Sequence, residues 1–234
     1  MHMVFPFQLF RSTSNLGKTL NTSLIFLIFC ICLTGCERQP PESAKSAIPK
    51  DLKYTLIENP IKISPFQLTD QNGNNFTDKQ LEGKWTFVFF GYSHCPDVCP
   101  TTLMEMDDLS KLLLKSAADL KPDNSAQNIQ YLFVTVDPER DTVAHLKNYI
   151  PYFNKTFTAL TGPMENIDKL ATEADIFHKI EKISESIAIV EHGSAIVLIN
   201  PSGYYYARFD APHYASDILA TFEKIKRFYN GNPS

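Results

Sequence analysis

Two short runs of almost uninterrupted apolar residues constrain the fold of this chain most strongly. They are Trp85–Phe90 (WTFVFF) and Ile129–Val136 (IQYLFVTV), both rich in aromatic and β-branched side chains. Runs of this kind are typical of strands that are buried on both faces of a sheet. Between them, apolar residues recur at helical spacing, so a helix is expected from Pro100 or Thr101 to about Leu120. Strand, helix and strand in this order predict a parallel βαβ unit.

The pattern around this unit predicts a complete α/β domain. An Asn-Gly pair, Asn72-Gly73, predicts a tight hairpin turn inside the segment 66–76. Further strands are expected at residues 157–160, 194–199 and 204–209, and further helices at 143–153, 166–177 and 215–229. The segment 179–189 is ambiguous between a hairpin and an extra loop. This order of elements matches a thioredoxin-like fold, with a mixed sheet, helices on both faces and an added N-terminal β-hairpin.

Residues 1–35 have the pattern of a secretory signal and not of a folded segment. The apolar run Leu24–Leu33 follows a stretch that contains basic but no acidic side chains. The run is too short to cross about 30 Å of hydrocarbon as a helix that rises about 1.5 Å per residue. It ends in Leu33-Thr34-Gly35-Cys36, which resembles a bacterial lipobox, so Cys36 is expected to be lipidated and to begin the mature chain. The alternative is an uncleaved anchor helix from about Leu20 to Cys36.

Both alternatives place the rest of the chain in a bacterial cell envelope, anchored to a membrane and facing the periplasm or the cell exterior. Residues 36–53 are rich in proline, serine and charge, which is typical of a tether, and residues 54–234 are expected to form the folded domain. The chain has 22 basic and 26 acidic residues, for a net charge of −4. This balance, without a basic stripe, argues against a nucleic-acid partner.

Among the five cysteines, one pair remains for the folded domain. Cys30 and Cys32 belong to the predicted signal and Cys36 is the predicted lipid site, which leaves Cys95 and Cys99. A single pair in a domain with a sizeable core is not a disulfide scaffold, so it is a candidate for chemistry. The pair follows the first buried strand and lies at the entry to a helix, whose N-terminus stabilises a thiolate and lowers the thiol pKa.

The spacing of the pair favours a bound metal, although a disulfide stays open. Three residues separate Cys95 from Cys99, whereas thioredoxin-type oxidoreductases usually have two. Residues four apart on a helix have Cβ atoms about 5–6 Å apart, and a disulfide needs about 3.5–4.5 Å. Two sulfurs that converge without needing to bond each other suit a chelated soft cation.

A third ligand is expected from His192, which lies just before the predicted strand 194–199. In a thioredoxin-like fold, the loop before this strand packs against the cysteine loop. Two thiolates and one imidazole favour copper, because structural zinc normally takes four ligands and no fourth is evident. A structural histidine is the alternative for His192. Of the remaining histidines, His94 is expected to point away from Cys95, and the others to lie at the surface or at helix ends: His145, His178 and His213.

Three blocks of this sequence, in order, closely resemble the signatures of the Sco/SenC family. They are FGYSHCPDVCP at residues 90–100, VDPERDT at residues 136–142, and Glu191-His192 followed by a strand and NPSG at residues 200–203. The resemblance spans about Ile63 to Tyr229. It implies a thioredoxin-like, membrane-tethered copper protein associated with assembly of the CuA centre of cytochrome c oxidase, with ligands at Cys95, Cys99 and His192. Glu191-His192-Gly193 departs from the pattern, because the family more often has Asp-His-Thr or similar here, although the histidine is kept.

The resemblance implies a copper metallochaperone that delivers copper to the apo CuA subunit of cytochrome c oxidase. A copper donor or a thiol reductant is then a further partner. The alternative is a thiol–disulfide oxidoreductase that keeps the cysteines of the oxidase subunit or of other exported proteins reduced, and a copper or redox sensor is a third reading. The sequence leaves open whether the protein is an enzyme; a metallochaperone is not one, although it can have thiol–disulfide oxidoreductase activity on the side. Asp97 is either a tuning group or a solvated loop acid, and Asp137 to Asp141 either form a turn, with Asp141 or Thr142 as helix cap, or act near the metal.

Overall fold

Strands and helices alternate along residues 47–119, 128–182 and 188–231, which are the residues that the computed structural model describes. The strands are β1 (Leu56–Lys62), β2 (Gln67–Asp70), β3 (Asn75–Thr77), β4 (Trp85–Gly91), β5 (Ile129–Thr135), β6 (Thr158–Thr161), β7 (His178–Lys182), β8 (Ala188–His192), β9 (Ile196–Ile199) and β10 (Tyr204–Phe209). The helices are α2 (Val98–Asp119), α3 (Val143–Tyr149), α4 (Met164–Glu173) and α5 (Ala215–Gly231), with short 3-10 helices η1 (Lys50–Leu52), η2 (Asp78–Leu81) and η4 (Ile150–Tyr152). No helix within these ranges is long and apolar enough to cross a membrane. The predicted signal and the predicted tether up to residue 46 lie outside the described residues.

Eight strands form one mixed sheet in the order β1-β10-β9-β4-β5-β6-β2-β3. Strand β4 lies inside the sheet, parallel to β5 and antiparallel to β9, and β5 is parallel to β6. The predicted hairpin forms β2 and β3 and turns at Gly73, whose φ of 84° is readily adopted by glycine. Through β2 it pairs with β6 and extends the sheet at one edge. The mixed sheet with an added hairpin therefore agrees with the predicted α/β fold.

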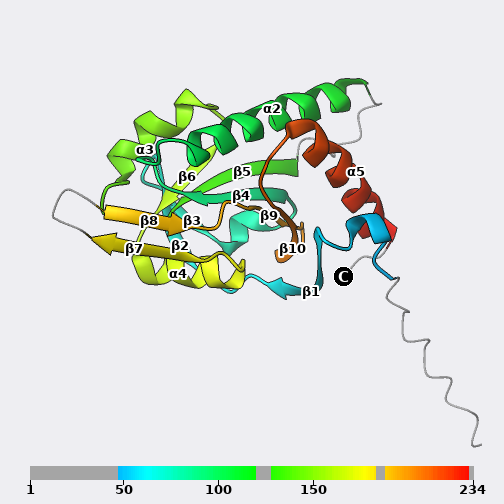
Figure 1. Ribbon diagram of the computed structural model, residues 1–234, viewed down its shortest axis with the longest axis horizontal. Coiled ribbons are helices and arrows are strands. Elements are labelled where there is room, and N and C mark those ends of the chain that lie inside the picture. The colour runs from blue at the N-terminus through cyan, green and yellow to red at the C-terminus, as the bar shows by residue number, and fades with distance from the viewer. Residues whose placement is uncertain (1–46, 120–127, 183–187, 232–234) are drawn as a thin grey trace, which may run out of the picture. The chain divides into compact units, whose positions relative to one another are not determined.

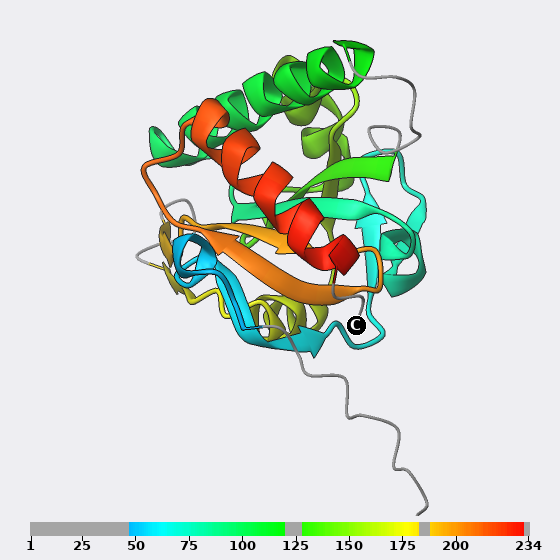
Figure 2. The same ribbon diagram turned by 90° about the vertical axis from the view of Figure 1, so that its right-hand side faces the viewer.

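Alternate side chains of β4 face the two layers of the core. Phe87 and Phe89 pack with α2 and α5, where the ring centroid of Phe222 lies 5.1 Å from that of Phe87. Val88 and Phe90 pack on the opposite face with α4. Figures 1 and 2 show α2 and α5 on one side of the sheet and α4 on the other. Every residue of β4 is buried, and each large apolar side chain contributes about 1.5–3 kcal/mol of burial free energy. The packing of β4 on both faces therefore fixes the point from which the next loop starts.

The folded domain begins earlier than the sequence analysis predicts. Strand β1 is absent from that prediction, and it contains Pro60, which has no N–H to donate to a ladder. The structure accommodates it at the edge of the sheet, where β1 pairs antiparallel with β10. Upstream, η1 buries Leu52 in the core, and Asp51 forms an ion pair with Lys224 at 2.8 Å. The predicted boundary at residue 54 is therefore wrong, since the residues just before it already pack on the domain.

The start of α2, the end of α4 and the segment 179–189 differ from the sequence prediction or resolve it. Helix α2 begins at Val98, so Cys99 lies in its first turn and not before it. Helix α4 ends at Glu173, short of the predicted residue 177, and Asp175 takes a left-handed φ of 52° just beyond. The ambiguous segment forms the antiparallel hairpin of β7 and β8, a separate two-stranded sheet in which His192 pairs with His178.

Candidate metal centre

The cysteine loop leaves the carboxyl end of β4 at Gly91 and enters α2 at Val98. A Cβ atom at Gly91 would lie 3.0 Å from Cys99 Sγ, 3.0 Å from the ring of Phe133 and 2.9 Å from the ring of Phe89. Real Cβ atoms essentially never show the shortest of these contacts and rarely show the other two, so any residue but glycine would require these buried groups to shift. Gly91 therefore makes room for the Cys99 sulfur against the end of the strand.

The two cysteines have different environments. Cys99 is fully buried and Cys95 is partly exposed, and the Cys99 N–H points at Cys95 Sγ over 3.4 Å. Burial raises the pKa of the Cys95 thiol, but hydrogen bonds from the backbone N–H groups of Asp97, Cys99 and Val98 and from the Cys99 side chain outweigh it and lower the net pKa. Burial raises the pKa of Cys99 far above its usual value. In the metal-free pair, Cys95 is therefore the cysteine that loses its proton more readily, and Cys99 is the one that keeps it.

This asymmetry predicts that iodoacetamide modifies Cys95 well before Cys99. Only a thiolate attacks the reagent, so the Cys95 rate should reach half of its plateau at a lower pH than the rate of an unperturbed cysteine side chain in an unfolded protein. The Cys99 rate should stay low beyond that pH, because its thiol is both buried and raised in pKa. Mass spectrometry of the reduced protein after timed labelling between about pH 5 and about pH 10 measures both rates. Equal labelling of the two cysteines at neutral pH would contradict the assignment.

His192 completes the site from the end of β8. Its Nε2 lies 3.4 Å from Cys99 Sγ, and its Nδ1 lies 3.0 Å from the Gly193 carbonyl oxygen. Donation from Nδ1 to that carbonyl leaves the Nε2 lone pair directed at the cysteines. The imidazole packs edge-on against Phe89 and Tyr92, with ring centroids 6.0 and 5.8 Å away. Burial lowers the pKa of His192, which keeps the ring neutral and able to bind a metal at neutral pH.

The three side chains singled out by the sequence thus meet at one point. Cys95 Sγ, Cys99 Sγ and His192 Nε2 all lie within 4.8 Å of one another. Within the described part of the chain, no fourth cysteine, histidine or carboxylate joins this group. Two thiolates and one neutral imidazole form a soft, three-membered donor set, which fits copper better than four-coordinate structural zinc.

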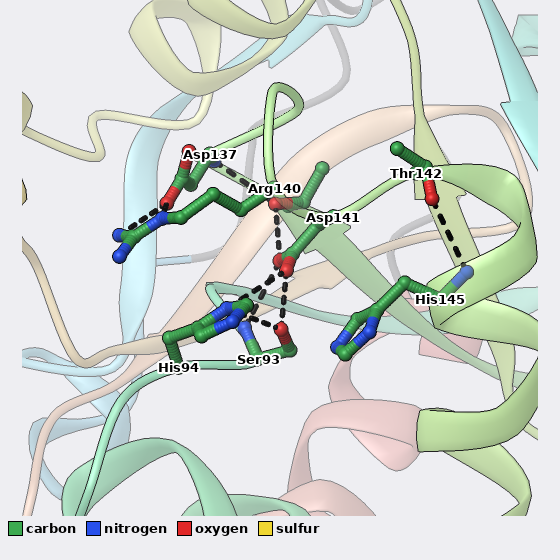
Figure 3. A network of polar contacts seen from close by, with 8 residues as sticks. Ser93, His94, Asp137, Arg140, Asp141, Thr142 and His145 are labelled. Carbon is green, nitrogen blue, oxygen red and sulfur yellow. Dashed lines mark hydrogen bonds and ion pairs between the residues drawn. The ribbon is translucent and has the colours of Figure 1, made fainter. Parts of the chain in front are cut away.

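The block 137–141 holds the cysteine loop in place. Asp141 is fully buried and accepts hydrogen bonds from the Ser93 N–H at 2.9 Å, from the Thr135 hydroxyl at 2.7 Å and from the Ser93 hydroxyl (Figure 3). Arg140 forms an ion pair with Asp137 and lies over the Tyr92 ring, 5.9 Å from its centroid. The block therefore positions the loop and touches none of the three sulfur and nitrogen donors. Thr142, and not Asp141, caps α3 by accepting from the His145 N–H.

Apart from the backbone N–H of Asp97, which donates to Cys95 Sγ, the other candidate residues lie outside the group of three donors. Asp97 is exposed, and its backbone carbonyl accepts from Thr101. His178 pairs with Asp168 at 2.7 Å. His213 is buried and contacts the Ser194 carbonyl oxygen over 2.7 Å, so the prediction of a surface or helix-end group is wrong for it. The sequence gives no signal for this, because the contact depends on the path of the chain before β9.

Fold and site together define a thioredoxin-like domain that carries a thiol–imidazole cluster beyond the carboxyl end of its central strand. A family model described as SCO1/SenC matches residues 55–227. The chain therefore belongs to the SCO1/SenC family.

Individual relatives agree with this assignment. An SCO2-like protein of Rickettsia prowazekii is 32% identical over 174 residues, which cover 73% of this chain and 80% of the relative. The structure of Bradyrhizobium japonicum ScoI with copper bound is similar at a TM-score of 0.60 and 36% identity, over 72% of this chain and 99% of that one. The structure of BsSco, described as a member of the Sco family of cytochrome c oxidase assembly proteins with a disulfide switch, has a TM-score of 0.53 and 25% identity, over 71% and 95%.

Proposed function

We propose that this protein is a copper metallochaperone for cytochrome c oxidase. Cys95, Cys99 and His192 would hold one copper ion, and the recipient would be the apo CuA subunit. The observation that carries the proposal is the convergence of the two sulfurs and Nε2 within 4.8 Å. It is supported by the similarity to ScoI, whose structure contains copper, and to BsSco, an oxidase assembly protein.

The unequal exposure of the donors suits transfer by ligand exchange. Cys99 is fully buried, whereas Cys95 and His192 are both partly exposed. In the loop that follows Cys95, Pro96 and Asp97 are exposed and Val98 keeps 44% of its surface accessible. A thiolate of the recipient can approach a three-coordinate ion from this side and displace Cys95 first. Copper would then stay liganded throughout, with the buried Cys99 released last.

Copper transfer to an isolated apo CuA domain tests the proposal. The full-length protein, loaded with one equivalent of Cu(I), should supply copper to the domain and generate the CuA absorption spectrum once an oxidant is added. His192→Ala should lose copper to a competing chelator before transfer. His178→Gln is the matched control, because it removes a histidine from the facing strand that lies outside the donor group. Equal transfer by His192→Ala and the wild type would overturn the proposed ligand set.

Thiol–disulfide exchange is the second candidate function, and the unequal cysteines favour it. The Cys95 thiolate can attack a target disulfide, and Cys99 can then displace the mixed disulfide, which releases a reduced target and leaves a Cys95–Cys99 bond. A thiol reductant must restore the pair. In a disulfide-reductase assay this function needs both cysteines and not His192. Reductase activity that survives His192→Ala, without tight copper binding by the wild type, would favour it over the metallochaperone.

The membrane tether is also part of the proposal. Lipidation at Cys36 would anchor the domain in the bacterial cell envelope, with an uncleaved N-terminal anchor as the alternative. Either anchor would keep the metal centre near a membrane-bound oxidase subunit.

A further inference from the structure

We propose that His94, Asp141 and His145 form a second metal site, which takes a borderline divalent cation such as Cu(II) or Zn(II). One imidazole nitrogen from each histidine and one carboxylate oxygen of Asp141 lie within 4.8 Å of one another. His94 comes from the cysteine loop. Asp141 comes from the turn before α3, and His145 lies in the first turn of that helix. The site is separate from the thiol–imidazole cluster and does not depend on the proposed copper delivery.

The two imidazoles are arranged side by side at the surface. Their ring planes are inclined by 18°, with centroids 5.4 Å apart, and both residues are exposed. Figure 3 shows them approaching the Asp141 carboxylate from two different segments of the chain. His94 Nδ1 lies 3.7 Å from Asp141 Oδ1, beyond hydrogen-bonding distance. The Ser93 hydroxyl bridges these two atoms, 3.0 Å from His94 Nδ1 and hydrogen-bonded to Asp141 Oδ1, so a cation that enters from solvent would replace this bridge.

Asp141 contributes a buried negative charge that lacks a permanent cationic partner. Its side chain is fully buried. Among the described residues, its one ion-pair neighbour is His94, and no lysine or arginine lies within 4 Å, since Arg140 pairs with Asp137 instead. A buried carboxylate without a counter-charge is costly, and a bound cation offsets that cost.

The carboxylate is already oriented for such a role. Oδ2 accepts from the Ser93 N–H and from the Thr135 hydroxyl, whereas Oδ1 accepts only the Ser93 hydroxyl and faces His94. Rotation of the Ser93 side chain would free both Asp141 Oδ1 and His94 Nδ1 for a metal, while both Oδ2 hydrogen bonds remain. Ligating carboxylates are commonly held by hydrogen bonds of this kind.

The donor set decides the class of cation. Two imidazole nitrogens and one carboxylate oxygen suit Cu(II), Zn(II) and Ni(II), whereas Cu(I) prefers the thiolates next door. Water would complete the coordination on the exposed side. Cu(II) should bind most tightly of the three, in line with the usual order of affinities.

The test uses untagged full-length protein in which Cys95→Ser and Cys99→Ser remove the thiolates. Titration with Cu(II) should show one bound equivalent, and electron paramagnetic resonance should show nitrogen ligation without a thiolate-to-copper absorption band. Adding His145→Gln should weaken this binding by at least about tenfold, the lower limit for losing even an outer-shell partner of a metal. Zn(II) should compete for the same site. Circular dichroism checks that all variants fold.

The outcomes separate this site from the proposed function. Loss of the Cu(II) signal in His145→Gln, with Cu(I) binding by the intact cysteines unchanged, supports the second site alone. Binding of Cu(II) that is indifferent to His145→Gln, or no bound Cu(II) in the protein without Cys95 and Cys99, overturns it and leaves the metallochaperone proposal untouched.

Discussion

Replacing Cys99 with serine is expected to weaken Cu(I) binding by more than about 100-fold. Loss of a residue that merely orients a metal ligand commonly costs about 10–100-fold in affinity, and Cys99 is proposed as a ligand itself. A hydroxyl is a hard, poor donor for Cu(I), so the remaining set of Cys95 and His192 cannot compensate. Serine can still donate a hydrogen bond toward His192 Nε2, so the fold should persist.

Competition with a Cu(I) chelator measures this loss, and thermal unfolding of the metal-free proteins measures the fold. His178→Gln serves again as the control and should keep wild-type affinity, because its side chain pairs with Asp168 and not with the cysteines. An affinity of Cys99→Ser within tenfold of the wild type would show that the buried sulfur does not ligate copper.

Gly91→Ala is expected to disturb both the fold and the metal centre. The added methyl group would lie about as close to Cys99 Sγ as to the rings of Phe89 and Phe133, all of them buried. Overpacking of a buried site typically costs about 1–3 kcal/mol, and relief here requires the Cys99 sulfur or an aromatic ring to move. We therefore expect a lower free energy of unfolding together with weaker copper binding.

Gly193→Ala provides the matched control on the other side of the site. A Cβ at Gly193 would come no closer than 3.8 Å to Ile176 or to the Phe177 carbonyl, which is ordinary contact. Denaturant unfolding and chelator competition should therefore give near wild-type values for this variant. If Gly91→Ala behaves like Gly193→Ala in both assays, the tight packing of the cysteine loop on β4 is not what positions Cys99.

The central strands and the cysteine pair could be predicted because their signals are local. The apolar run of β4 and the helical spacing within α2 are each contained in a short window of sequence. The approach of His192 to the pair was predicted from the fold topology together with the family resemblance. Strand β1 could not be predicted because β10, the strand that it pairs with, lies about 150 residues away along the chain.

Contacts between distant segments explain the remaining differences. Asp141 looks like a helix cap in the sequence, yet it holds Ser93, 48 residues earlier, and so fixes the cysteine loop. His94 and His145 look like isolated surface groups, and only the packing of the loop against α3 brings their rings together. Neither contact leaves a periodic or compositional trace, so the proposed second site could be found only in three dimensions.

X-ray absorption at the copper edge of the protein loaded with one equivalent of Cu(I) tests the central claim most directly. If Cys95, Cys99 and His192 hold the ion together, the spectrum should fit two sulfur scatterers and one imidazole nitrogen. The imidazole signal should disappear in His192→Ala and remain in His178→Gln. A wild-type spectrum with sulfur scatterers alone, or one that His192→Ala leaves unchanged, would contradict the three-donor copper centre.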